Sequence, residues 1–97
     1  MSQATEENMR VGGWSTYSYE ITPQASAAFK EAFEGFVGVS YEPVAFATQI
    51  VSGSNYSFFC NAKVVYPGAS NEAAIVCIYK PLDGKAHIKE IRRVPQC

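Results

Sequence analysis

The alternation of side chains between Tyr56 and Tyr66 constrains the fold more than any other feature of this 97-residue chain. Successive side chains of a strand point to opposite faces of a sheet, so a period of two predicts a strand with one face toward a core. The residues that share this face are Tyr56, Phe58, Cys60, Ala62, Val64 and Tyr66. The chain must therefore build a sheet, together with an element that covers its apolar face.

One amphipathic helix supplies that cover. Thr22 and Pro23 form a strong helix start, because threonine is a good N-cap and proline suits the first helical position. Apolar residues then recur at steps of three and four and mark one face. They are Ala25, Ala28, Phe29, Ala32, Phe33 and Phe36. We expect Gly35 or Gly38 to end the helix, and its apolar face to pack on the sheet.

Strand patterns fill the rest of the chain. A short strand is predicted at residues 14–19, before the helix, and four more follow at 41–48, 54–66, 73–79 and 86–94. The run 73–79 is apolar on both faces, which is typical of a covered inner strand. The last strand and its approach carry the basic residues Lys85, Lys89, Arg92 and Arg93. Such charges are typical of a protected sheet edge.

These elements predict an α+β fold in the order β-α-β-β-β-β, with one helix packed across a curved antiparallel sheet of about five strands. A chain of 97 residues can bury one modest core. We expect residues 1–10 to form a flexible N-terminal arm and residues 11–97 to form a single domain.

Charge and hydropathy exclude several classes of partner. The net charge is −1, whereas proteins that bind nucleic acid or a membrane surface usually carry a basic excess. No apolar run approaches the roughly 20 residues that span a bilayer. The polar, acidic start of the chain does not resemble a signal peptide. We therefore expect no nucleic-acid or membrane partner, and slightly favour a cytoplasmic location over export after removal of a leader.

The three cysteines do not form a recognisable framework. Cys60, Cys77 and Cys97 are odd in number and lack the short spacings of disulfide-rich or zinc-binding domains. We expect Cys60 and Cys77 to be core residues, since free cysteine is often buried. A cross-strand disulfide between them is the alternative. Cys97 is expected to be exposed and free.

No catalytic constellation is visible. His87 is the only histidine, and a Cys–His pair would need an accessible cysteine close to it. The chain also lacks metal-ligand spacings and a glycine-rich phosphate loop. We therefore expect no enzymatic activity, and no catalytic, cofactor-binding or metal-binding residues.

The segment Gln49-Ile50-Val51-Ser52-Gly53 separates two long strand patterns, so we predict that it forms a hairpin tip. Such tips normally carry Asn-Gly or Asp-Gly with polar flanks, but this one carries two large apolar side chains. Exposed apolar residues at a tip favour contact with a partner. The alternative is an ordinary turn in which Val51 packs back on its own sheet.

The pentapeptide also matches the pattern Gln-x-Val-x-Gly and resembles the corresponding loop of the cystatins, reversible protein inhibitors of papain-like cysteine proteases. The predicted order of elements is similar to that family over residues 11–94. The resemblance implies a three-part wedge that enters the protease cleft. Its parts would be the glycine segment Val11, Gly12 and Gly13, the tip Gln49, Ile50, Val51, Ser52 and Gly53, and the second loop Pro81 and Leu82.

Within this resemblance, Val11 would offer its side chain to the enzyme and Gly12 would bend the chain. Pro81-Leu82 is similar to a Pro-Trp pair of many cystatins, with leucine in place of tryptophan. Losing a tryptophan removes a residue that often anchors interfaces, so we expect weaker binding or a different target. The two disulfides of secreted animal members have no counterpart in this chain.

The expected function is reversible, non-covalent inhibition of a papain-like cysteine protease. The main alternative is a protein- or peptide-binding module of the same fold without protease-inhibitory activity. A third interpretation is a small catalytic or ligand-binding domain with a pocket between helix and sheet. We expect a monomer, with a domain-swapped dimer formed by opening the hairpin as the alternative.

Overall fold

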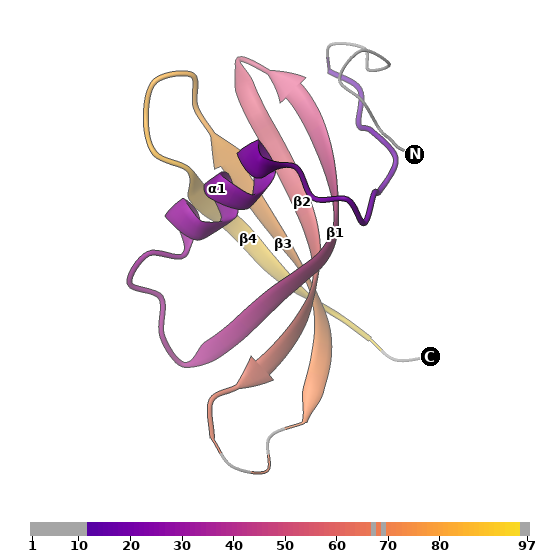
Figure 1. Ribbon diagram of the computed structural model, residues 1–97, viewed down its shortest axis with the longest axis vertical. Coiled ribbons are helices and arrows are strands. Elements are labelled where there is room, and N and C mark those ends of the chain that lie inside the picture. Colours follow the sequence, from indigo (N-terminus) through magenta and orange to yellow (C-terminus); the bar gives the residue numbers. More distant parts are fainter. Residues whose placement is uncertain (1–11, 67, 69, 96–97) are drawn as a thin grey trace.

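A computed structural model describes residues 12–66, 68 and 70–95 as one helix and a four-stranded antiparallel sheet (Figure 1). The elements are α1 (Pro23–Ala32), β1 (Val39–Val51), β2 (Gly53–Val64), β3 (Asn71–Lys80) and β4 (His87–Val94). The expected α+β class is therefore confirmed. The expected N-terminal arm at residues 1–10, Val11 and Cys97 lie outside the described residues.

Helix α1 begins where the sequence predicts. The Thr22 hydroxyl accepts a hydrogen bond from the Ala25 amide at 3.2 Å, and Pro23 occupies the first turn. The helix ends at Ala32, earlier than Gly35. The backbone tightens there, with the Phe36 amide bonded to the Phe33 carbonyl at 2.9 Å, and Gly35 then turns the chain at a φ of +78°.

The early end of the helix changes the place of Phe36. This residue was expected on the apolar helical face, but it lies beyond the helix and is exposed. Its ring still contacts Phe33, with ring centroids 5.0 Å apart, and Tyr41 of β1 at 5.9 Å. A small aromatic group therefore covers the start of β1, and its members Phe33 and Tyr41 pack against the main core.

The sheet has the order β1-β2-β3-β4, with every neighbouring pair antiparallel. The first of the five predicted strands, at residues 14–19, is wrong: it does not form a strand in this structure. Only two isolated bridges join that segment to β1, Trp14 with Gln49 and Ser18 with Phe46. The register shifts by one residue between the two bridges, so a regular ladder cannot form.

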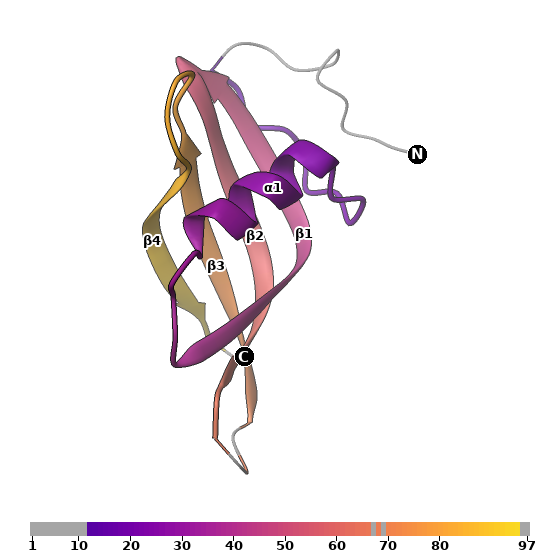
Figure 2. The same ribbon diagram turned by 60° about the vertical axis from the view of Figure 1, so that its left-hand side comes forward.

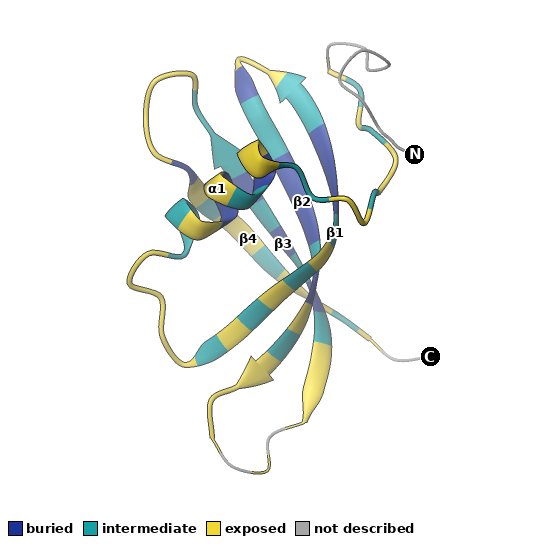
Figure 3. Ribbon diagram, viewed as in Figure 1, coloured by how far each residue is buried: buried dark blue, intermediate teal, exposed yellow. Residues whose placement is uncertain are grey.

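The core lies between α1 and the strands that it crosses (Figure 3). Phe29 of the helix meets Phe58 of β2 edge-on, with ring centroids 4.9 Å apart. The most deeply buried large side chains are Phe58, Cys60, Val76 and Ile78. These side chains fill the interface of helix and sheet, which argues against the ligand pocket that the third interpretation placed there.

The two described cysteines lie on opposite faces of the sheet. Cys60 is fully buried on the helix side and pairs in register with Ala74. Cys77 alternates with buried Val76 and Ile78, so it faces away from the helix, where it is half-buried. Both are free cysteines. The disulfide alternative is therefore wrong, because cysteines on opposite faces of a sheet cannot be bridged locally. The core position expected for Cys77 is also wrong, because this residue is only half-buried on the face away from the helix.

The sheet has two distinct ends (Figure 2). At the upper end the tip of the β1–β2 hairpin lies beside the loop that joins β3 to β4. At the lower end the β2–β3 hairpin projects beyond the core, and β2 stops at Val64 rather than at Tyr66. In the described part of the chain, no helix is long and apolar enough to span a membrane.

Candidate functional site

The β1–β2 hairpin remains paired almost to its last residue. Val51 pairs with Gly53, which leaves only Ser52 at the apex. The predicted five-residue turn from Gln49 to Gly53 is therefore too long, and Gln49 and Ile50 belong to β1. Gly53 makes this sharp reversal feasible because its φ is +101°, a conformation that residues with a Cβ rarely adopt.

Gly53 is also buried against the end of β3. A Cβ added at this position would lie 2.4 Å from the Lys80 carbonyl oxygen and 3.0 Å from the Pro81 Cα. No side chain fits at these distances, so close approach requires glycine as well. The hairpin tip therefore rests directly against the beginning of the second predicted loop.

A side chain from β3 fixes the apex. The Tyr79 hydroxyl donates a hydrogen bond to the Ser52 carbonyl oxygen. On its other side the Tyr79 ring meets the His87 ring edge-on, with centroids 5.7 Å apart. The only residue outside the ladder at the tip is thus held by a strand distant in sequence.

Gln49 joins the glycine segment to the hairpin. Its Nε2 donates to the Gly12 carbonyl oxygen at 2.8 Å, and its Oε1 accepts from Asn55 Nδ2 at 2.8 Å. A carbonyl oxygen can only accept, so Gly12 determines which end of the Gln49 amide faces it. The polar atoms of Gln49 are therefore used inside the fold, where they hold Gly12 against β1.

The backbone of the N-terminal segment follows the upper half of β1. The Gly12 amide donates to the Ile50 carbonyl at 2.9 Å, and the Ser15 amide donates to the Thr48 carbonyl at 2.9 Å. In return, the Thr48 amide donates to the Ser15 hydroxyl at 3.0 Å. These bonds fix the position of Gly12 and Gly13 relative to the hairpin tip.

The described parts of the three predicted segments therefore meet at the upper end of the sheet (Figures 1 and 2). Leu82 is 81% exposed, Val51 is 37% exposed, and Ile50 is half-buried. We call this surface the apical edge. It consists of Gly12, Gly13, Ile50, Val51, Ser52, Gly53, Pro81 and Leu82.

Sequence reasoning missed the residues that brace the apical edge. Tyr79 and Asn55 lie in regular strand patterns that give no sign of their tertiary partners. Trp14 was assigned only to the predicted first strand, although it directly follows Gly12-Gly13. The one available signal was that Trp14 is the only tryptophan in the chain.

The titratable groups give little chemistry to this end of the sheet. Burial raises the pKa of the Cys60 thiol to about 12, so it is not a thiolate near neutral pH. His87 pairs in register with Tyr79, whereas Cys77 pairs with Glu90, so the histidine and this cysteine are not directly opposite each other in the ladder. Within the described residues, no three His, Cys, Asp or Glu side chains are grouped to hold a metal ion.

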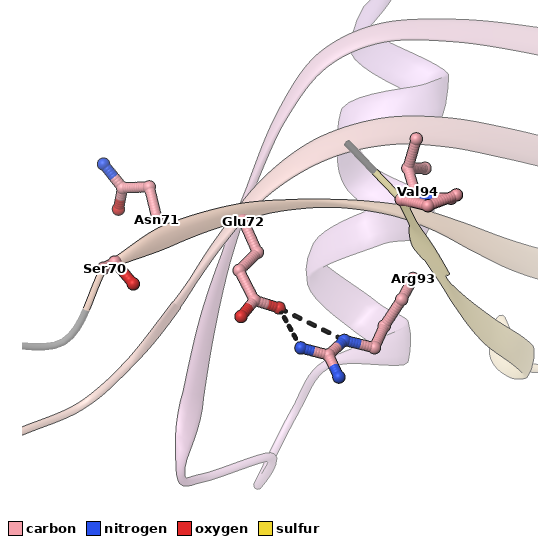
Figure 4. A pocket seen from close by; sticks show the side chains of 6 residues that line it. Ser70, Asn71, Glu72, Arg93 and Val94 are labelled. Carbon is pink, nitrogen blue, oxygen red and sulfur yellow. Dashed lines mark hydrogen bonds and ion pairs between the residues drawn. The ribbon is translucent and has the colours of Figure 1, made fainter. Parts of the chain in front are cut away.

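Three of the basic residues near the last strand, Lys85, Arg92 and Arg93, have acidic partners. Arg93 Nη2 lies 2.5 Å from Glu72 Oε1, and this hydrogen bond raises the pKa of Arg93. The pair lies beside a shallow hollow of about 610 Å³ at the lower end of the sheet (Figure 4). Lys85 is similarly paired with Glu34, at 3.0 Å. These pairs fit a solvated sheet edge better than an anion-binding surface.

The chain matches no family model, no curated protein and no solved structure. The apical edge is therefore the feature of this chain that bears on its function.

Proposed function

We propose that the chain is a reversible, non-covalent inhibitor of papain-like cysteine proteases, related in kind to the cystatins. One observation carries the proposal: the Gln49 amide bonds Gly12 to the hairpin, while Gly53 packs the same hairpin on the loop that carries Leu82. Three separate segments thus share one narrow edge. Val11, which lies outside the described residues, stays a predicted contact residue in this proposal.

The shape and polarity of the apical edge support this function. Exposed apolar side chains at Val51 and Leu82 can bury surface in a cleft, and burial of apolar area favours association. The tip is braced by Tyr79, so docking costs little conformational entropy. Inhibition of this kind covers the catalytic cysteine and histidine of the enzyme without presenting a peptide bond for attack. It requires no chemistry from the chain.

A second candidate is a protein- or peptide-binding module that does not act on proteases. It is favoured by Leu82, which offers less contact area than the tryptophan found there in many cystatins. Both candidates use the apical edge. They differ only in whether that edge fits the cleft of a papain-like enzyme.

Titration of papain with the full chain, followed by cleavage of a fluorogenic peptide, separates the two candidates. The inhibitor proposal predicts reversible loss of cleavage, with activity recovered on dilution. Removing residues 1–13 should weaken the inhibition, because the glycine segment is then lost. Full papain activity at high micromolar concentrations of the folded chain would refute the inhibitor proposal and leave the binding module.

A further inference from the structure

Trp14 is a large aromatic side chain that the fold leaves half in solvent. It is the only tryptophan of the chain and is 50% exposed. The backbone on both sides of it is fixed, by the bond from Gly12 to Ile50 and the bond from Ser15 to Thr48. An exposed aromatic on a fixed backbone has little conformational freedom to lose when a partner covers it.

Its position relative to the apical edge follows from the bridge to Gln49. Residues directly opposite each other in an antiparallel pair share one face of the sheet. Gln49 alternates with buried Thr48 and therefore lies on the face turned away from α1. Trp14 shares that face, so it flanks the apical edge on the outer side of the sheet.

Trp14 lies close enough to the hairpin tip for one partner to cover both. Gln49 is three residues from Ser52, which is roughly 10 Å along a strand. A standard interface covers about 800 Å² on each partner, a patch with a radius of about 16 Å. A patch centred on Ser52 therefore includes Trp14. Tyr19 follows Ser18, which lies opposite Phe46, and at roughly 20 Å it falls outside.

From this arrangement we propose that Trp14 is a further partner-binding residue, and that it supplies the aromatic anchor which the second loop lacks. The inference rests on the proposed inhibitory function and deepens it. Tryptophan is strongly enriched among residues that dominate binding energy. Trp14 lies beside the glycine segment, whereas the second loop carries only Leu82. The partner should therefore present an apolar surface next to the glycine segment.

Inhibition kinetics with matched variants test the proposal. We expect Trp14→Ala to weaken papain inhibition by about 30-fold, the scale of a hot-spot truncation. Trp14→Phe should recover much of the loss because it keeps an aromatic ring. Tyr19→Ala is the control: Tyr19 is 82% exposed in the same segment, and its removal should leave the inhibition constant unchanged. Thermal melting checks that each variant is folded.

A second readout does not depend on substitution. A chain labelled with 5-fluorotryptophan has one ¹⁹F signal, because Trp14 is the only tryptophan. Papain with its catalytic cysteine blocked by methylthiolation is then added. We expect the signal to shift and to stop changing at one equivalent.

The outcomes separate this inference from the proposed function. If the wild-type chain inhibits papain but Trp14→Ala inhibits equally well, the role of Trp14 is overturned and the inhibitor proposal stands. An unmoved ¹⁹F signal under conditions of complete inhibition has the same meaning. If the wild-type chain does not inhibit at all, the inhibitor proposal fails, and the role of Trp14 fails with it.

Discussion

The two hairpin ends of this sheet expose similar side chains in different settings. At the upper end, Val51 is 37% exposed beside an apex that Tyr79 holds through the Ser52 carbonyl. At the lower end, Val65 is 69% exposed, and the bond from its amide to the Gly38 carbonyl at 3.1 Å ties it to the start of β1. Exposed apolar surface alone therefore does not distinguish the two ends. The two ends differ instead in how firmly tertiary contacts hold them in place.

Under the proposed function, this difference favours the upper end as the docking site. A braced apolar edge binds with little loss of conformational freedom, whereas exposed side chains that few tertiary contacts hold lose more of it on binding. The glycines show the same contrast. Gly53 is enclosed by the backbone of the β3 end, while a Cβ added at Gly68 would meet nothing within 4 Å.

The largest effect is expected from alanine at the enclosed glycine. Gly53→Ala forces a Cβ to 2.4 Å from the Lys80 carbonyl oxygen and strains a φ of +101°. We expect it to lower the free energy of unfolding by about 3 kcal/mol, through collision and backbone strain together. Gly68→Ala strains only a φ of +80°, because the added Cβ meets nothing within 4 Å. It should lower the free energy of unfolding by about 1 kcal/mol. Equal losses in urea unfolding would contradict the comparison.

A charge placed at each end tests which end meets the partner. Val51→Asp puts a carboxylate at the braced apical edge, where binding would strip it of water. We expect papain inhibition to weaken by at least about 30-fold. Val65→Asp at the lower end should leave the inhibition constant unchanged. A similar loss in both variants would show that docking is not confined to the apical edge.

Removing the Gln49 bridge should loosen the apical edge without unfolding the chain. Gln49→Ala deletes two side-chain hydrogen bonds, each of which contributes about 1 kcal/mol. We expect a loss of roughly 1–2 kcal/mol in the free energy of unfolding. Faster hydrogen exchange at the Gly12 amide should accompany it. Asn61→Ala, at an exposed position on the same sheet, is the control and should change neither quantity.

The smallest effect concerns one hydroxyl at each end. Tyr79→Phe removes only the bond to the Ser52 carbonyl, so we expect a loss of about 1 kcal/mol in the free energy of unfolding. Inhibition should weaken modestly as the apex loosens. Tyr66→Phe at the lower end removes an exposed hydroxyl and should be neutral. If the two substitutions cost the same, Tyr79 does not brace the tip.

Local rules predicted much of the fold. The start of α1 follows from Thr22 and Pro23, which satisfy the first turn within four residues of sequence. The buried face of β2 follows from its alternation, confirmed at Tyr56, Phe58 and Cys60. The predictions failed where long-range pairing decides. Residues 14–19 carry a strand-like pattern, but their bonds to β1 are out of step by one residue.

The candidate site was only partly predictable. A short motif drew attention to Val51 and Gly53, but it also suggested that Gln49 belongs to a five-residue turn. In the structure Gln49 is a strand residue whose amide links two segments 37 positions apart. No local pattern encodes such a link, because a side-chain amide can bond equally well to water, to its neighbours or to a distant carbonyl.

The sequence by itself determined the helix start, the alternating face of β2, the inner position of β3 and the charged edge of β4. Each depends on properties that repeat within a few residues, such as capping, periodicity and side-chain polarity. Only the tertiary structure decided that Tyr79 meets Ser52, that Gly53 must fit against Lys80, and that Cys77 faces away from the core. Those outcomes depend on which strands pair and in what register, and register is set by the packing of the whole sheet.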